Sequence, residues 1–326
     1  MSTNGHVASA EVRGPSATSA VLVACLLALP VMTAAQSANT ADLPRTPWGV
    51  PDLQGVWDTR TMTPLERPEQ FADQAFLTDE QAAEYERQTI ERRNDDDVSH
   101  SVHAKYWLDW GDQLYADKRT SLIVDPPNGR VPPLTQAGRR RADARRAVRS
   151  ARGRADSWED RTLWERCLTR GLPTVMLPAP YNGYVQILQT PDVVVIYTEM
   201  IHEARIVAMD GRPPLPAELH QWLGDSRGWW EDDTLVVETT NFTDHTIFRG
   251  SGANLHLVER FTRLGPDTVN YEFTVTDPTT WPRPWSVAFP IMKVEESIYE
   301  YACHEGNYAL RNMLAYARAE ELGTAK

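Results

Sequence analysis

The chain has 326 residues, a net charge of −12, 41% hydrophobic residues and 3 Cys, which allows one large domain or two ordinary ones and excludes a small disulfide scaffold. The acidic balance argues against a general nucleic-acid binder, because phosphate contacts require a basic surface. The hydrophobic content excludes wholesale disorder, and the 11 Trp and 23 Pro indicate a folded, turn-rich protein.

The first 35 residues have the pattern of an export signal. A polar start with Arg13 precedes an apolar run over 20–32 that is too short to span a bilayer, and small residues follow. We predict cleavage after Ala35. The alternative, a lipoprotein signal processed at Cys25, is disfavoured because the apolar run continues past that cysteine. No later segment is long and apolar enough to cross a membrane, so we expect a periplasmic or secreted protein.

Cleavage leaves two cysteines, Cys167 and Cys303. A distant pair in an oxidising compartment is a candidate disulfide. Closing this loop of about 136 residues would stabilise the fold by about 4–5 kcal/mol in the chain-entropy treatment. The alternatives are two buried thiols or a soft-metal site, but the C-x-x-C spacing of a structural zinc site is missing. We therefore predict the disulfide.

The N-terminal part of the mature chain combines a linker with helical insertions. Residues 36–52 contain prolines that interrupt regular structure. Capping and apolar spacing predict helices over about 78–93 and 103–116, and a third insertion covers about 135–154. The stretch 139–154 contains eight arginines. It is either an anchor for anionic lipid or another polyanion, or a solvated helix, which is favoured because almost no large apolar residue is present to enter a membrane.

From residue 181 onward, apolar and polar residues alternate, which predicts strands joined by tight turns. The expected strands cover 184–188, 193–200, 205–209, 234–241, 255–263, 268–276, 285–291 and 298–303, and a terminal helix covers about 310–320. Successive hairpins without long intervening helices favour an antiparallel meander. We predict one mainly β domain over 53–326, in which the meander closes into a lipocalin-like barrel or a strongly curved sheet.

Four longer motifs occur together in this chain. They are DLQGVW from residue 52, WLGDSRG from 222, DTLVVETTNFTD from 233 and YEYACHEGN from 299. As a set they resemble a large family of exported, mostly uncharacterised bacterial proteins, over nearly the whole mature chain. The resemblance implies a shared fold and export, and it carries over no activity and no catalytic residues. The opening Gly55-Val56-Trp57 is also similar to the start of lipocalins and related calycins, which implies a cupped β structure.

The commonest catalytic motifs are missing from the sequence. It contains no Gly-rich nucleotide loop, no Walker lysine, no G-x-S-x-G elbow and no H-E-x-x-H helix. What remains is a dispersed set of titratable residues in the β region. His202 alternates with Ala204 and Ile206, so a regular strand would place it on their apolar face, where it could point into a cavity. A buried imidazole near a carboxylate can act as a general acid or base.

Five residues are candidates for proton transfer. His202 and His304 are the preferred acid–base groups, and Glu203, Asp244 and Glu305 are candidate partners or orienters. Strand parity separates each histidine from the glutamate that follows it, so a dyad would have to form between strands. Alternatively, the histidines are hydrogen-bonded core residues and Asp244 forms an Asx-type turn. A metal held by both histidines and a carboxylate fits the ligand chemistry but no diagnostic spacing, so we predict no metal or other cofactor.

A second set of residues could line a pocket for a small molecule. These are Trp222, Trp230, Tyr184, Tyr197, Asn241 and Trp285. Core packing accounts for most tryptophans, because each buries a large area wherever it lies. Where the aromatic residues are accessible, they could contact an apolar or aromatic ligand or stack on a sugar ring. Asn241 could equally form a turn.

The leading hypothesis is an exported enzyme that acts on a small apolar or aromatic molecule. It would use cofactor-independent acid–base chemistry such as elimination, hydration, isomerisation or cyclisation. The alternatives are a periplasmic lipocalin-like carrier of a hydrophobic ligand and a metal-dependent hydrolase. The expected partner is in each case a small molecule, with no nucleic acid and no stable membrane span. The sequence indicates no oligomeric state.

Overall fold

The computed structural model describes residues 43–95, 108, 111–153 and 155–324. The predicted signal, its cleavage site and Cys25 lie outside these ranges, as does most of the helix predicted over 103–116, whose described part over 111–116 is not helical. The helices are α1 (Asp79–Asp95), α2 (Gln136–Ser150) and α3 (Tyr308–Glu321). Within the described ranges, no helix has both the length and the apolar character needed to cross a membrane.

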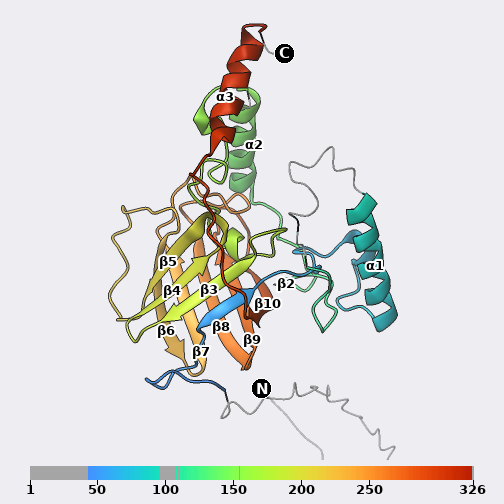
Figure 1. Cartoon of the computed structure of the whole chain (residues 1–326), viewed down its shortest axis with the longest axis vertical. Helices are drawn as coiled ribbons and strands as arrows, with labels where there is room; N and C mark the ends of the chain where they lie inside the picture. The colour runs from blue at the N-terminus through green and yellow to red at the C-terminus, as the bar shows by residue number, and fades with distance from the viewer. Residues whose placement is uncertain (1–42, 96–107, 109–110, 154, 325–326) are drawn as a thin grey trace, which may run out of the picture. The chain divides into compact units, whose positions relative to one another are not determined.

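Ten strands form one sheet that closes on itself (Figure 1). They are β1 (Gly55–Asp58), β2 (Ile123–Asp125), β3 (Tyr184–Gln189), β4 (Val193–Thr198), β5 (Glu203–Ala208), β6 (Asp225–Glu231), β7 (Thr234–Thr240), β8 (His256–Gly265), β9 (Thr268–Thr276) and β10 (Trp285–Val294). β1 pairs with both β3 and β10 and so closes a ring made of β1 and β3 to β10, while β2 adds to β10. The predicted mainly β barrel is confirmed.

The structure differs from the predicted antiparallel meander at one pair of neighbouring strands. β5 and β6 run parallel, with Val207 opposite Ser226, whereas the other neighbours in the ring are antiparallel. A closed ring with an odd number of strands cannot alternate direction all the way round, so at least one parallel pair is required. The long connection over 209–224 provides it, because parallel neighbours need a crossover rather than a tight turn.

The inside of the barrel is a packed core rather than an open cup. Inward side chains alternate with outward ones along β8 and β9, and the inward positions include large aromatic residues with no exposed area, among them Trp57, Tyr271 and Phe289. The Tyr271 ring lies 5.3 Å from that of Phe289 and 4.9 Å from that of Phe261, between centroids. Such packing stabilises the fold by removing apolar area from water.

One charged pair is enclosed in this core. The guanidinium of Arg205 donates from Nη1 and Nη2 to the two carboxylate oxygens of Glu259, at 3.1 and 2.5 Å. The hydroxyl of Tyr271 donates to the same carboxylate at 2.8 Å. The side chains of Arg205 and Glu259 are 5% and 0% exposed. Neither charge is solvated by water, so each is stabilised mainly by the other.

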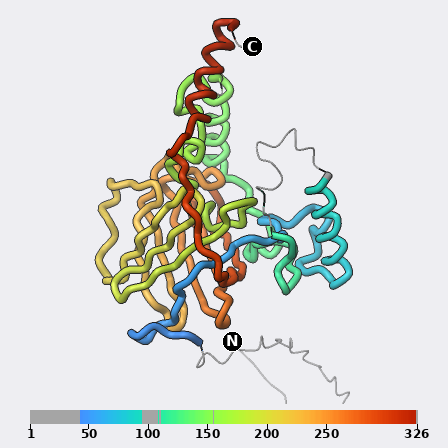
Figure 2. Tube along the Cα trace, viewed as in Figure 1, coloured from blue at the N-terminus to red at the C-terminus, as the bar shows by residue number. Residues whose placement is uncertain are grey.

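Two further features concern the insertions and the C-terminal segment. α2 is largely exposed; it contacts the rest of the chain through Arg141, which donates to Thr280, and Arg145, which donates to the carbonyl of Gly250. The strand predicted over 298–303 is wrong. That segment is extended without pairing in the sheet, and it runs along the outside of the barrel from β10 toward α3 (Figure 2).

Candidate functional site

A pocket lies between the outer wall of the barrel and this C-terminal segment. It has a volume of about 1020 Å³. Its floor comes from the start of β3 and the end of β4, and its other walls come from residues 164–165 and 299–309. Six aromatic residues line it: Trp164, Tyr181, Tyr184, Tyr299, Tyr301 and Tyr308. Its size and aromatic lining are typical of a small-molecule site.

A disulfide joins two of the pocket walls. Cys167 and Cys303 are bonded, with their Cα atoms 5.7 Å apart, so the predicted disulfide is confirmed. Next to it, the Trp164 indole donates to the Tyr301 hydroxyl at 3.3 Å. The ring of His202 also contacts the Tyr301 carbonyl, at 2.7 Å from Nδ1. Because a carbonyl only accepts, Nδ1 is the donor. These bonds hold the C-terminal segment against the barrel.

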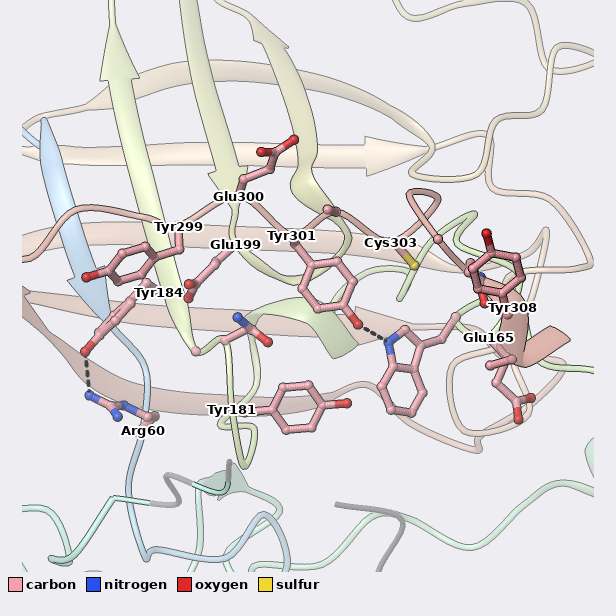
Figure 3. Close-up of a pocket in the computed structure, with 17 residues that line it drawn as sticks. Arg60, Glu165, Tyr181, Tyr184, Glu199, Tyr299, Glu300, Tyr301, Cys303 and Tyr308 are labelled. Atoms are coloured by element: carbon pink, nitrogen blue, oxygen red, sulfur yellow. Dashed lines mark hydrogen bonds between the residues drawn. The ribbon is translucent and has the colours of Figure 1, made fainter. Parts of the chain in front are cut away.

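Glu199 supplies a buried carboxylate to this pocket. It follows directly after β4, its backbone N–H donates to the carbonyl of Tyr184 at 3.0 Å, and the residue is only 3% exposed. Its Oε2 is buried and has no hydrogen-bond partner among the described residues. Figure 3 shows the carboxylate pointing into the space between Tyr184 and Tyr301. Leaving a buried carboxylate oxygen unsatisfied is costly, so this arrangement calls for a functional explanation.

Of the other charged residues that line the pocket, Arg60 and Glu165 have partners on the protein, and Glu300 is exposed. Arg60 forms a two-point contact with Asp58, at 2.8 and 2.7 Å, and donates to the Tyr184 hydroxyl at 2.9 Å. Glu165 accepts a hydrogen bond from Arg161. Glu199 differs from these residues because it is deeply buried and has no cationic partner among the described residues.

Two tyrosine hydroxyls of the pocket, those of Tyr181 and Tyr184, resist ionisation. Burial raises the pKa of Tyr181 to about 12. Burial also raises the pKa of Tyr184, which the Arg60 charge opposes. Behind the pocket, Arg170 lies over the Trp164 ring at 4.7 Å from its centroid, and burial lowers the pKa of its guanidinium. At neutral pH Tyr181 and Tyr184 are thus neutral rings whose hydroxyl groups can donate and accept hydrogen bonds.

The predicted acid–base histidines come together, but outside this pocket. The rings of His202 and His304 lie 6.5 Å apart between centroids, and both residues are exposed. The expectation that His202 shares a cavity-facing side with Ala204 and Ile206 is wrong. Ile201 and His202 have positive φ values of 64° and 46°, which end the strand alternation before β5 begins, and Ile206 faces outward at 57% exposure.

The predicted carboxylate partners are dispersed. Glu203 accepts from the backbone N–H of Arg170 at 3.2 Å, and burial raises its pKa. Glu305 is exposed beyond the disulfide. Asp244 accepts from the backbone N–H of Ala253 at 3.0 Å in a different loop and does not line the pocket. The turn interpretation of Asp244 fits this contact.

Of the predicted ligand-binding residues, Tyr184 lines the pocket. Tyr197 lines a smaller adjoining pocket of about 620 Å³ that shares Tyr299 with the first. The others have different surroundings. Trp285 is fully buried in the core, Trp230 packs partly against it, Trp222 lies at the surface beside His245, and Asn241 donates to the carbonyls of Leu215, Pro216 and Leu219.

Sequence reasoning missed Glu199, Tyr299 and Tyr301. The alternating tyrosines directly before Cys303 were an available signal, because a disulfide that fixes Cys303 also fixes its neighbours. Glu199 gave none, since a glutamate at a strand end is usually exposed. Within the described ranges, no group of three His, Cys, Asp or Glu side chains could hold a metal ion.

Comparison with known proteins leaves the site to be interpreted from its geometry. No family model matches the chain, and no curated sequence or solved structure is significantly similar to it.

Proposed function

We propose that the protein binds a small aromatic or apolar molecule in the tyrosine-lined pocket and that Glu199 removes a proton from it as a general base. The observation that carries this proposal is the carboxylate of Glu199, which lines the pocket and whose buried Oε2 has no hydrogen-bond partner among the described residues. The reaction would need no cofactor and would belong to the eliminations, hydrations, isomerisations or cyclisations.

Two properties of the pocket support this proposal. The Glu199 carboxylate lines the pocket next to the tyrosine rings, so it is placed to accept a proton from a bound molecule. The tyrosines Tyr181, Tyr184 and Tyr301 offer ring faces to an aromatic substrate, and hydroxyl groups to the charge that develops on it.

We further propose that the chain is exported and belongs to the family of exported bacterial proteins that its motifs resemble. The disulfide between Cys167 and Cys303 is compatible with an oxidising compartment. The N-terminal sequence of the protein isolated from its host tests this point. A start at Gln36 is expected, and retention of residues 1–35 would contradict it.

Turnover by the Glu199→Gln variant tests the assignment of the base. A set of aromatic compounds is incubated with the wild-type protein, and conversion is followed by mass spectrometry. For a converted compound, we expect Glu199→Gln to lower kcat by about 10²-fold or more. The control is Glu238→Gln, which removes a carboxylate that pairs with His256 elsewhere on the barrel and is expected to change kcat by less than about threefold. Full turnover by folded Glu199→Gln would refute the assignment.

His202 and His304 are the second proposal for the proton-transfer groups, because their rings lie close together beside the pocket wall. If both His202→Ala and His304→Ala keep full turnover while Glu199→Gln loses it, the histidines have no role in the reaction. A carrier function in the same pocket is the alternative to an enzyme. Recovery of unchanged ligand after long incubation would favour the carrier. A metal-dependent hydrolase stays a prediction, and elemental analysis of the purified protein tests it.

A further inference from the structure

We infer that the ligand of the tyrosine-lined pocket carries an alkylated ammonium group, which lies beside Glu199 between the rings of Tyr299 and Tyr301. This inference rests on the proposed function and adds the charge of the ligand to it.

The aromatic residues around Glu199 provide the first argument. Ring faces attract an organic cation through the ring quadrupole, and the attraction grows when the site is shielded from water. Figure 3 shows Glu199 with Tyr184 and Tyr299 on one side and Tyr301 on the other. The rim residue Tyr299 is 75% exposed, so it is accessible to a ligand. The guanidinium of Arg60 already lies over the Tyr184 ring, 4.9 Å from its centroid. The rings of Tyr299 and Tyr301 are therefore the ones that an ammonium group beside Glu199 would contact.

The charge balance of the pocket provides the second argument. Among the described residues, neither Glu199 nor Glu300 forms an ion pair. The positive charge of Arg60 is already matched by Asp58, which holds it at two points. A neutral ligand covering Glu199 would remove its remaining water and leave a buried charge without a partner. A cationic ligand supplies that partner, which decides between the two classes because an unpaired buried charge is the costlier outcome.

The position of the cation within the pocket follows from Arg170. Its guanidinium lies over the Trp164 ring, 4.7 Å from the centroid, so that end of the pocket already has a positive charge behind it. A ligand cation at the same end would be repelled. The ammonium group is therefore placed at the Glu199 end, and the apolar body of the ligand extends toward Trp164 and Tyr181, whose rings lie 6.2 Å apart between centroids.

The test compares two probes of the same shape and different charge. Phenyltrimethylammonium and its neutral counterpart tert-butylbenzene are titrated into the full-length protein by isothermal titration calorimetry at fixed ionic strength. We expect the cation to bind about tenfold or more tightly than the neutral probe. In Glu199→Gln this preference should fall below about threefold, because the carboxylate charge is lost while the shape is kept.

Matched variants locate the effect in the pocket. Glu238→Gln removes one negative charge from a half-buried residue that pairs with His256 elsewhere on the barrel, and it should leave the preference unchanged. Tyr299→Leu replaces a largely exposed residue. It should weaken binding of the cation by about threefold or more and that of the neutral probe by less. This variant keeps the test decisive if Glu199→Gln does not fold.

The outcomes separate this inference from the proposed function. Binding of tert-butylbenzene as tight as that of the cation would overturn the inference and leave an aromatic site with Glu199 as base. A cation preference that persists in both Glu199→Gln and Tyr299→Leu would also overturn it, because the site would lie elsewhere. If neither probe binds, the inference is overturned. The base assignment is decided separately, by turnover of Glu199→Gln.

Discussion

The buried pair inside the barrel gives a prediction about stability that can be worked out from its contacts. Glu259→Gln keeps the shape of the side chain but leaves the guanidinium of Arg205, whose side chain is 5% exposed, without a counter-charge. Removing one partner of a buried pair costs about 3–5 kcal/mol, because the remaining charge stays in the core. We expect the free energy of unfolding to fall by that amount.

Removing both charges should be far less harmful. In Arg205→Met/Glu259→Leu no buried charge remains, and apolar replacements of buried pairs are often neutral or stabilising. The remaining cost is the hydroxyl of Tyr271, which donates to Glu259 at 2.8 Å and would lose its acceptor, at about 1–3 kcal/mol. Adding Tyr271→Phe removes that hydroxyl. The triple variant should therefore be close to the wild type in stability.

Urea unfolding followed by tryptophan fluorescence measures these differences. Urea is preferred to a guanidinium salt because it leaves the ionic strength unchanged. The double-mutant cycle between Arg205 and Glu259 gives their coupling energy. A loss of less than about 1 kcal/mol in Glu259→Gln would refute the reasoning, because Arg205 would then have another partner or access to water.

Three further predictions concern the disulfide, a buried carboxyl group and a turn. Cys167→Ser/Cys303→Ser should lower the free energy of unfolding by up to about 5 kcal/mol in urea and weaken probe binding in the pocket, and unchanged binding would show that the walls do not need the bond. Burial raises the pKa of Glu203 above 4.5, so the folded chain holds this proton more tightly than the unfolded chain. Stability should accordingly fall as the pH rises from 4.5 through the raised pKa. Glu203→Gln should flatten that fall in urea titrations, and an unchanged slope would refute the assignment. Gly224 has φ +68° and a Cβ there would lie 2.4 Å from the carbonyl oxygen of Thr240. Gly224→Ala should therefore cost about 2 kcal/mol or more, and a thermal midpoint equal to that of the wild type would contradict this.

The barrel strands were readable from the sequence because their side chains alternate between core and solvent. β9, for example, covers Thr268–Thr276, the range that alternation predicted. Strand direction was not readable in this way, since alternation is the same in both directions. The parallel pairing of β5 with β6 depends on ring closure and on the crossover that precedes β6. The segment 298–303 alternates too, yet it pairs with no strand.

The candidate site depends on the tertiary structure even more than strand direction does. Local periodicity in the sequence predicted the barrel strands, and capping and apolar spacing predicted the helices α1 and α2. The two cysteines left in the mature chain predicted the disulfide between Cys167 and Cys303. Only the tertiary structure shows that the tyrosine-lined pocket lies outside the barrel, because large inward side chains fill the interior. It also decided that Glu199 and Tyr301, which are far apart in the chain, face one pocket. That pocket exists because the C-terminal segment is bonded across the barrel wall, a long-range contact that no local pattern encodes.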